Sequence, residues 1–387
     1  MATENNNKTL NVPNLRFPEF SGEWTKTTLG KIGETFNGLT GKSGSDFGQG
    51  SPYITYKSIF DNSKIDLSRV EYVTITDAER KKQTQNEVQY GDIFFTTSSE
   101  TPDEVGMTSV LLDEVKDCYL NSFCFGYRLN SITDVLPEYM RFYLRSNTIR
   151  RRLFVLAQGS TRFNISKGEV MGLTIKLPGT AEQRKIAQLL TMIEDRIDTQ
   201  IKIIEKLESL IKGLCQKLTQ HGNPNTTLNE ALVCYSSTLQ ESSVQETGDY
   251  PVYGATGVCG YTDTPEVDGD SILIIKDGAS VGVTYYASGR YSAIGTLNRI
   301  VAKRGYSLRY LYYCLKVFNF APYRTGLAIP HIYFRDYGKA KVWCPSLDEQ
   351  QRIADALSKV EQKIAIEKSL LEQLYSQKRF LLQSMFI

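Results

Sequence analysis

Two long helical patterns that begin with the same short motif limit what this chain can fold into. "LPGTAEQRKIAQLL" begins at Leu177 and "CPSLDEQQRIADAL" at Cys344, and the two stretches match at a constant offset of 167 residues. Apolar residues then recur every three or four positions, which is the period of a coiled-coil helix. About 37 residues follow each shared Glu, or roughly 55 Å of helix. The seam positions are Ile186, Leu190, Ile193, Ile197, Ile204 and Ile211 in the first helix, and Ile353, Leu357, Val360, Ile364, Leu371 and Leu374 in the second.

Both helix starts carry the signature of a capping box. Thr180 precedes Gln183 by three residues, and Ser346 precedes Glu349 by three. In such a box the hydroxyl accepts from the N3 amide, and the N3 side chain returns to the amide of the cap. "HGNPN" at 221–225 is expected to end the first helix.

Helices of this length do not stay single in water with an apolar stripe exposed. One interpretation is a coiled coil between two copies of the chain. The other is an antiparallel pair formed by the two helices of one chain. Two matched stripes of equal length in one sequence favour the second interpretation.

The repeat extends to the globular parts that precede the helices. Strand-like segments rich in β-branched and aromatic residues occur in each copy, followed by a short helix, near 137–146 and 308–318. We therefore predict an α+β fold in which two β-rich globular domains are joined by an antiparallel coiled coil, with approximate twofold symmetry. The expected parts are a disordered tail (1–11), a first domain (12–178), a first long helix (179–220), a linker and second domain (221–345) and a second long helix (346–387).

The charge of the chain is unevenly distributed. The net charge is only +2, but 141–176 holds eight Lys or Arg and one acid, and 290–341 holds ten and one. The two basic stretches occupy matched places, just before the long helices. Matched positive stretches fit a polyanion that contacts both domains.

The sequence lacks recognisable nucleotide-binding and catalytic motifs. There is no G-x-x-x-x-G-K-[ST] nucleotide loop and no convincing catalytic constellation, so we expect no catalytic residue. Two histidines and seven scattered cysteines predict neither a metal site nor disulfides, and reduced thiols indicate the cytoplasm. The N-terminus does not read as a signal peptide, and no window approaches the roughly 18 apolar residues of a membrane span.

These features together resemble a known family. The paired helix openings at Pro178/Glu182/Gln183 and Pro345/Glu349/Gln350, the opening "VPNLRFPEF" and the double copy of domain plus helix are similar to the specificity subunits of type I restriction-modification systems. The resemblance covers nearly the whole chain.

The resemblance implies a function without catalysis in this chain. Two target-recognition domains would each bind one half of a bipartite double-stranded DNA target, while the coiled coil sets the spacer and docks two modification subunits. Those partners would use S-adenosylmethionine to methylate adenine N6. Restriction subunits would use ATP and Mg to translocate and cleave DNA. No cofactor is expected in this chain.

Contact residues are predicted on the loops at matched positions. The base-reading candidates are Thr97, Ser98, Ser99, Ser160, Thr161, Arg162 and Asn164 in the first copy, and Lys276, Asp277, Ser280, His331 and Tyr333 in the second. The phosphate candidates are Arg150, Arg151, Arg152, Lys167, Arg299, Lys303, Arg304, Arg324 and Lys339. Two rival interpretations remain, a coiled-coil scaffold whose globular ends bind protein and an enzyme with an unrecognised active site.

Overall fold

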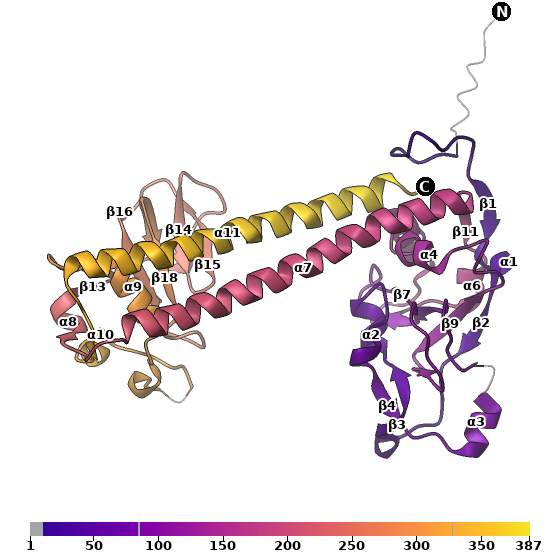
Figure 1. Cartoon of the computed structure of the whole chain (residues 1–387), viewed down its shortest axis with the longest axis horizontal. Helices are drawn as coiled ribbons and strands as arrows, with labels where there is room; N and C mark the ends of the chain where they lie inside the picture. Colours follow the sequence, from indigo (N-terminus) through magenta and orange to yellow (C-terminus); the bar gives the residue numbers. More distant parts are fainter. Residues whose placement is uncertain (1–10, 84–85, 327) are drawn as a thin grey trace, which may run out of the picture. The chain divides into compact units, whose positions relative to one another are not determined.

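The computed structural model describes residues 11–83, 86–326 and 328–387. Within them the chain forms two compact units, the first reaching Thr199 and including Glu372–Ile387, the second spanning Gln200–Leu371. Each unit contains a globular part and one segment of each of two long helices, α7 (Thr180–Thr219) and α11 (Leu347–Ser384) (Figure 1). The tail expected over residues 1–11 lies outside the described residues except for Asn11.

The first unit is built on an antiparallel four-stranded sheet in the order β2-β9-β5-β7. The same unit contains a three-stranded sheet in the order β4-β3-β8. In addition, β1 pairs with β11. Its elements are β1 (Thr25–Thr28), α1 (Leu29–Ile32), β2 (Gly33–Asn37), η1 (Gly44–Asp46), β3 (Phe47–Ile54), α2 (Tyr56–Asp61), η2 (Leu67–Arg69), β4 (Glu71–Val73), α3 (Asp77–Gln83), β5 (Ile93–Thr96), β6 (Ser98–Ser99), β7 (Thr108–Val110), β8 (Tyr119–Leu120), β9 (Cys124–Leu129), α4 (Pro137–Tyr143), α5 (Asn147–Leu156), β10 (Phe163–Asn164), α6 (Lys167–Met171) and β11 (Thr174–Leu177).

The second unit repeats this plan with shorter connections. Its central antiparallel sheet has the order β13-β20-β17-β18, a second sheet has the order β15-β14-β19-β16, and β12 pairs with β21. Its elements are β12 (Thr226–Thr227), α8 (Leu228–Ala231), β13 (Leu232–Ser236), η4 (Glu241–Ser243), β14 (Tyr250–Gly254), β15 (Gly257–Thr262), β16 (Val267–Asp268), β17 (Ser271–Ile275), β18 (Thr284–Ala287), β19 (Arg290–Ala293), β20 (Leu297–Ala302), α9 (Leu308–Lys316), η5 (Ala321–Tyr323), α10 (Phe334–Tyr337) and β21 (Lys341–Val342).

The predicted α+β fold is confirmed. The strand-like segments of the sequence form strands, including the buried β5 and β17 at the centres of the two four-stranded sheets. Both are continuous apolar runs because each has a neighbour on both sides and is covered on both faces. The two expected short helices are α4 and α9.

In each unit the segments of α7 and α11 lie side by side and run in opposite directions (Figure 1). In the first unit Lys378 of α11 donates to Glu194 of α7 at 2.7 Å, and in the second Ile211 and Cys215 of α7 share one apolar cluster with Leu357 of α11. Pairing within one chain, rather than between two copies, is therefore the correct interpretation. All the predicted seam residues are buried except Val360 and Leu371, which are partly buried.

One layer of the seam is polar. Gln200 of α7 and Glu367 of α11 are both buried, and the Gln200 amide nitrogen donates to the Glu367 backbone oxygen at 3.1 Å and to its carboxylate. The two residues occupy the same position in the two copies of the helix, 167 residues apart. A buried polar pair of this kind favours one helix register, because any slip leaves its groups without partners.

The repeated Gln of each helix start connects the long helix to the short one. The Gln183 side chain accepts from the Leu136 amide at 2.9 Å and donates to the carbonyls of Pro178 and Asp134. Gln350 does the same in the second unit, with the Ser307 amide and the Pro345 carbonyl, both at 2.9 Å.

The capping box predicted at Thr180 and Gln183 is wrong, because α7 already begins at Thr180 and Gly179 holds the cap position, while the Gln183 side chain bonds to Leu136, Asp134 and Pro178. At α11 only half of the box is present. Ser346 accepts from the Glu349 amide at 3.4 Å, while the Glu349 carboxylate pairs with Arg352 at 2.7 Å.

Glu182 of α7, which matches Glu349 of α11 in the repeat, binds different partners. Glu182 is buried and makes a two-fold hydrogen-bonded ion pair with Arg16, at 2.8 and 2.7 Å, and Trp24 donates to it at 3.4 Å. The segment that carries "NVPNLRFPEF" is thereby attached to the helix start. Leu15 adds a backbone bond of 2.9 Å to Ser384 near the end of α11.

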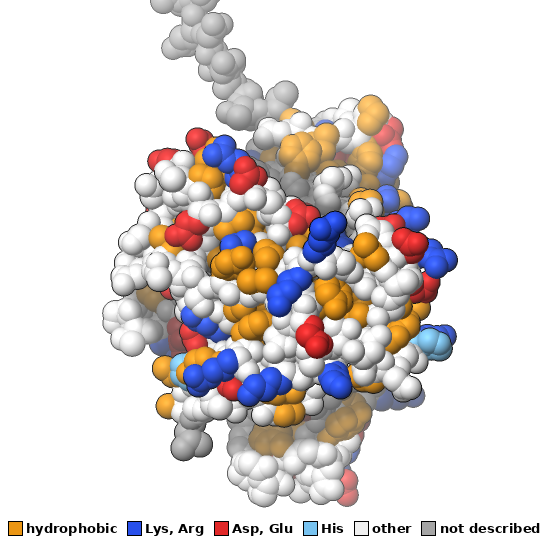
Figure 2. Space-filling view, turned by 90° about the vertical axis from the view of Figure 1, so that its left-hand side faces the viewer, with side chains coloured by type: hydrophobic (Ala, Val, Ile, Leu, Met, Phe, Trp, Pro, Cys, Tyr) orange, Lys and Arg blue, Asp and Glu red, His pale blue; other side chains and the backbone are white. Residues whose placement is uncertain are grey.

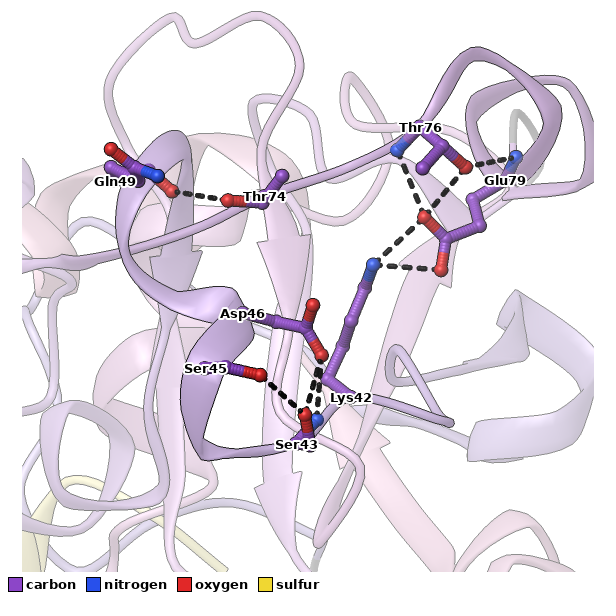
Figure 3. A network of polar contacts seen from close by, with 8 residues as sticks. All are labelled: Lys42, Ser43, Ser45, Asp46, Gln49, Thr74, Thr76 and Glu79. Atoms are coloured by element: carbon purple, nitrogen blue, oxygen red, sulfur yellow. Dashed lines mark hydrogen bonds and ion pairs between the residues drawn. The ribbon is translucent and has the colours of Figure 1, made fainter.

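A polar network fixes the loop between β2 and β3 of the first unit (Figure 3). The Lys42 ammonium is nearly buried and donates to both oxygens of Glu79 at 2.7 and 2.8 Å, and the amide and hydroxyl of Thr76 donate to the same carboxylate. Beside it, Ser43 and Asp46 form a capping box at η1. The Lys42 hydrogen bond, followed by those from Thr76, lowers the pKa of Glu79 to about 2.

This network predicts a contribution to stability that disappears in acid. Because the pKa of Glu79 is lower in the folded state, the contribution is complete above its unfolded value of about 4.3 and is lost as the pH falls toward 2. Glu79→Gln should therefore be destabilised at pH 7 but lose less stability than the wild type between pH 5 and 2. The measurement is urea unfolding across that range, together with an NMR titration of Glu79. In Lys42→Met the pKa of Glu79 should move back toward 4.3, and an unmoved titration would contradict the assignment.

Candidate nucleic-acid interface

The first unit brings two of the predicted contact loops together. The chain leaves the central strand β5 and continues as β6, which pairs antiparallel with β10, with Ser99 opposite Phe163 and Ser98 opposite Asn164. The Ile165 amide then donates to the Thr97 carbonyl at 3.0 Å. Segments more than 60 residues apart in the sequence therefore form one small surface.

The second unit joins the matched loops with the same backbone bonds. The Ile332 amide donates to the Lys276 carbonyl at 2.9 Å, and the Gly278 amide donates to the Pro330 carbonyl at 3.0 Å. His331 lies opposite Asp277, and its Nδ1 donates to the Asp277 carboxylate at 2.7 Å. We call this shared arrangement the paired-loop frame.

A tight turn closes one side of the frame in each unit. Gln158 and Asn164 exchange backbone bonds of 2.9 and 2.8 Å, and Thr325 and His331 exchange bonds of 2.9 and 2.7 Å. The residue after the first member of each pair is a glycine with positive φ, +139° at Gly159 and +88° at Gly326.

Only glycine fits these two positions. A Cβ on Gly159 would collide with the carbonyl oxygen of Arg162, and one on Gly326 with that of Ile329. Both units therefore need a glycine at the start of this turn, whatever residues stand at its tip.

The base-reading candidates differ in how much of each side chain is free. Thr97 donates its hydroxyl to the Phe123 carbonyl at 2.7 Å, and the buried Ser99 donates to Glu104 at 3.0 Å, so both have structural partners. Tyr333 is exposed and its ring lies nearly parallel to that of His331. The candidates with exposed side chains are Ser160, Thr161, Arg162, Asn164, Ser280 and Tyr333, while Ser98, Lys276, Asp277 and His331 are half-buried.

A cleft of about 400 Å³ opens beside the frame of the first unit. Its aromatic wall consists of Tyr56 and Phe60, whose rings stack at 6.0 Å, and of Phe123, which is 65% exposed. Ser98, Ser99, Glu100, Glu104 and Arg162 supply the polar wall.

Sequence reasoning missed the aromatic wall and Glu100. Phe123 stands two and four residues before Phe125 and Tyr127, which are fully buried in β9. Alternation along a strand therefore predicts burial for Phe123 as well, and only the start of β9 at Cys124 explains its exposure.

Several phosphate candidates are occupied by contacts within the protein. Arg150 donates to the carbonyls of Asp103, Val105 and Gly106 at 2.5–2.7 Å, and burial lowers the pKa of its guanidinium. The others with such contacts are Arg152 (to the Thr174 carbonyl), Lys167 (to the Asn37 side chain), Lys303 (to the Asn229 carbonyl), Arg324 (to the Val281 carbonyl) and Arg299 (over the Tyr235 ring at 4.3 Å).

Three phosphate candidates remain free. Arg151, Arg304 and Lys339 are exposed, and their side chains have no hydrogen bond or ion pair within the described ranges. Figure 2 shows one face of the molecule on which Lys and Arg side chains are set among hydrophobic, uncharged and acidic ones.

Other kinds of site find little support among the residues described. No group of three or more His, Cys, Asp or Glu is placed to hold a metal ion in that part of the chain. All seven cysteines are free thiols. None of the helices described is both long and apolar enough to cross a lipid bilayer.

Comparison with known proteins gives one consistent group. The model of the family described as "Type I restriction modification DNA specificity domain" matches residues 21–209 and 235–376. The putative type I restriction enzyme MjaX specificity subunit of Methanocaldococcus jannaschii is 28% identical over 218 residues, 56% of this chain and 50% of that protein. The type I restriction enzyme EcoprrI specificity subunit of Escherichia coli is 23% identical over 172 residues, 44% of this chain and 38% of that protein.

The match with these two curated relatives extends over half of their length or less. Among solved structures, the S subunit of the type I restriction-modification system from M. genitalium superposes with a TM-score of 0.63 at 18% identity, covering 97% of this chain and 99% of that one. This likeness shows the fold over the part of the chain that it covers.

Proposed function

The chain belongs to the family of type I restriction modification DNA specificity domains, and we propose that it is the DNA-recognition subunit of a type I restriction-modification complex. In this proposal residues 12–178 and 221–345 are target-recognition domains, and each binds one half of a bipartite double-stranded target. The helices over 179–220 and 346–387 set the spacer between the halves and dock two modification subunits. The complex acts in the cytoplasm.

The paired-loop frame is the observation that carries this proposal. The same backbone bonds hold polar and aromatic side chains at the same place in both units, and each unit also carries an exposed arginine, Arg151 or Arg304, in the sequence stretch richest in positive charge. Two equivalent surfaces in one chain suit a target read in two halves, because each surface needs to recognise only a few base pairs.

In this proposal the catalytic steps are carried out by the partner subunits. The chain recognises DNA without catalysing a reaction and without a cofactor of its own. The modification subunits supply S-adenosylmethionine and methylate adenine, while restriction subunits supply Mg- and ATP-dependent translocation and cleavage. Two rivals predict different behaviour. A protein-binding scaffold has no salt-dependent affinity for DNA, and an enzyme is active as the isolated chain.

The deciding experiment combines the chain with a modification subunit. The two proteins are expressed together and apart in a host without adenine methylation, and methylated adenines are mapped across its genome. We expect a split motif with a fixed gap only when both proteins are present. Methylation by the modification subunit alone at the same motif, or no motif with both proteins, would contradict the proposal.

Phosphate contacts should be visible as a change in salt dependence. Arg304→Ala and Arg151→Ala should weaken binding of the complex to every duplex alike, and each should reduce the slope of log affinity against log salt by about 1. The measurement is fluorescence anisotropy at several salt concentrations with cognate and scrambled duplexes. Arg352→Ala, an exposed arginine paired with Glu349 on α11, is the matched control and should leave the slope unchanged. A loss confined to the cognate duplex would assign these arginines to base reading instead.

A further inference from the structure

The paired-loop frame aligns the tips of the two units residue by residue. Ile165 and Ile332 bond to Thr97 and Lys276 in the same way. Counted from these bonds, Glu100 and Ala279 occupy the same sequence register, three residues after Thr97 and Lys276, although the backbone differs just before them because Gly278 has a φ of +101° and Ser99 has no positive φ. The glycine turns set Arg162 against Ile329, since each carbonyl lies against the glycine of its turn.

In the first unit these two positions are charged and available. Glu100 and Arg162 are both exposed and both line the cleft, and within the described residues neither side chain has a hydrogen bond or ion pair. Neighbouring polar groups such as Ser99 and Glu104 are already bonded to each other. The cleft thus offers one planar cation and one carboxylate with unused hydrogen-bonding capacity.

A free carboxylate on a DNA-binding surface restricts what it can meet. Phosphates repel it, whereas the amino group of cytosine in the major groove is the donor that Glu and Asp accept from. Arginine fits the opposite member of that pair, because its fork matches O6 and N7 of guanine. The aromatic wall of Tyr56, Phe60 and Phe123 lowers the local dielectric, which strengthens such bonds.

In the second unit the same two positions are apolar. Ile329 is 57% exposed at the tip of its turn, and Ala279 is exposed on the facing loop. Neither side chain can donate or accept a hydrogen bond. What such side chains recognise on a base edge is the methyl group of thymine.

We propose that the two units read opposite kinds of base pair at this shared position. The first unit reads a G·C pair, with Arg162 on guanine and Glu100 on the amino group of cytosine. The second unit reads an A·T pair, with Ile329 against the thymine methyl. This inference rests on the proposed function, which says that the units read DNA but not which bases they select.

The test exchanges the chemistry of the first unit for that of the second. The wild-type chain and the double variant Glu100→Ala/Arg162→Ile are each assembled with the modification subunit, and the methylated motifs are mapped. In the wild type one half-site should contain a G·C pair at which any other pair lowers methylation about tenfold or more. In the variant that position should lose its requirement for G·C and take the A·T preference of the second unit, while the other half-site stays the same.

Two further variants separate base reading from charge and from damage to the fold. Arg162→Lys keeps the charge and loses the fork, so it should relax the same position while DNA affinity at low salt stays within about twofold. Ile329→Ser should relax one A·T position in the other half-site only. Thermal unfolding of each variant is measured beside the wild type. If a variant methylates too slowly to map, competition with duplexes altered at each position of the wild-type motif gives the same answer.

The outcomes distinguish a failure of the proposed function from a failure of the base-reading inference alone. A wild-type complex without any split motif would overturn the proposed function. A split motif that the double variant leaves unchanged, or a relaxed position that was not G·C, would overturn this inference alone. Relaxation by the double variant with full selectivity in Arg162→Lys would assign the effect to charge, which also contradicts guanine reading.

Discussion

Replacing Arg145 by methionine is expected to lower the free energy of unfolding of the first unit by about 3–5 kcal/mol, because several carbonyl acceptors, most of them partly buried, then lose their donor. Its guanidinium donates to the carbonyls of Thr108, Ile59, Phe60 and Asn62 at 2.6–3.1 Å. Burial, assisted by the charge of a neighbouring arginine, lowers its pKa to about 10, so it is still charged at neutral pH. One side chain thus holds the end of α2 against strand β7.

The measurement is urea unfolding monitored by circular dichroism. Arg151→Met is the matched control, since this arginine is exposed six residues further on and should change stability by less than about 0.5 kcal/mol. Arg145→Lys should recover only a small part of the loss, because an ammonium group cannot reach carbonyls spread over a planar fork. Equal stability of Arg145→Met and Arg151→Met would refute the role given to Arg145.

Gln183→Leu is expected to cost about 2–4 kcal/mol, because it removes the partners of the Leu136 amide and of two carbonyls in a buried place. Leucine has a similar volume, so the loss measures the hydrogen bonds and not a cavity. Gln350→Leu should cost a similar amount in the second unit, where the Ser307 amide is left without its acceptor.

The control for both variants is Gln216→Leu, at an exposed position of α7, which should be within about 0.5 kcal/mol of the wild type. Hydrogen exchange adds a local readout, because the amides of Leu136 and Ser307 should lose protection in the matching variant only. Unchanged protection at these amides would show that the glutamines are not what anchors the short helices.

Much of the fold could be predicted because the strongest signals in the sequence are periodic. The apolar stripes define two helices and their pairing, and the β-rich segments define the strands, since both patterns follow from burial on one face. The capping box at Thr180 failed for a reason outside the local sequence. The helix begins at Thr180, so Thr180 is its first residue and not its cap, and Gln183 is its fourth, whose side chain bonds to the amide at the start of α4 instead.

The candidate interface could be predicted only in outline. Matched loops in a repeat fall at matched places, so their meeting in the frame follows from the repetition. The partners of individual side chains do not, and this is why Arg150 reads as a surface cation in the sequence although it bonds to three carbonyls. Glu100 could not be identified as a contact residue from the sequence, because its role depends on a cleft formed by residues from distant segments.

In the glycine turns, the backbone hydrogen bonds that hold the frame are independent of the side chains exposed at its tip. The bonds that close each turn use backbone atoms of Gln158 and Asn164, or of Thr325 and His331, and any residue can supply them. Side chains at the tip, such as Thr161 and Arg162, are exposed and contribute little to folding. Substitutions there are consequently almost free of a penalty in stability, so the preference of one unit can drift through many single steps while both units stay folded. Under the proposed function, such a protein can acquire new DNA targets one half at a time.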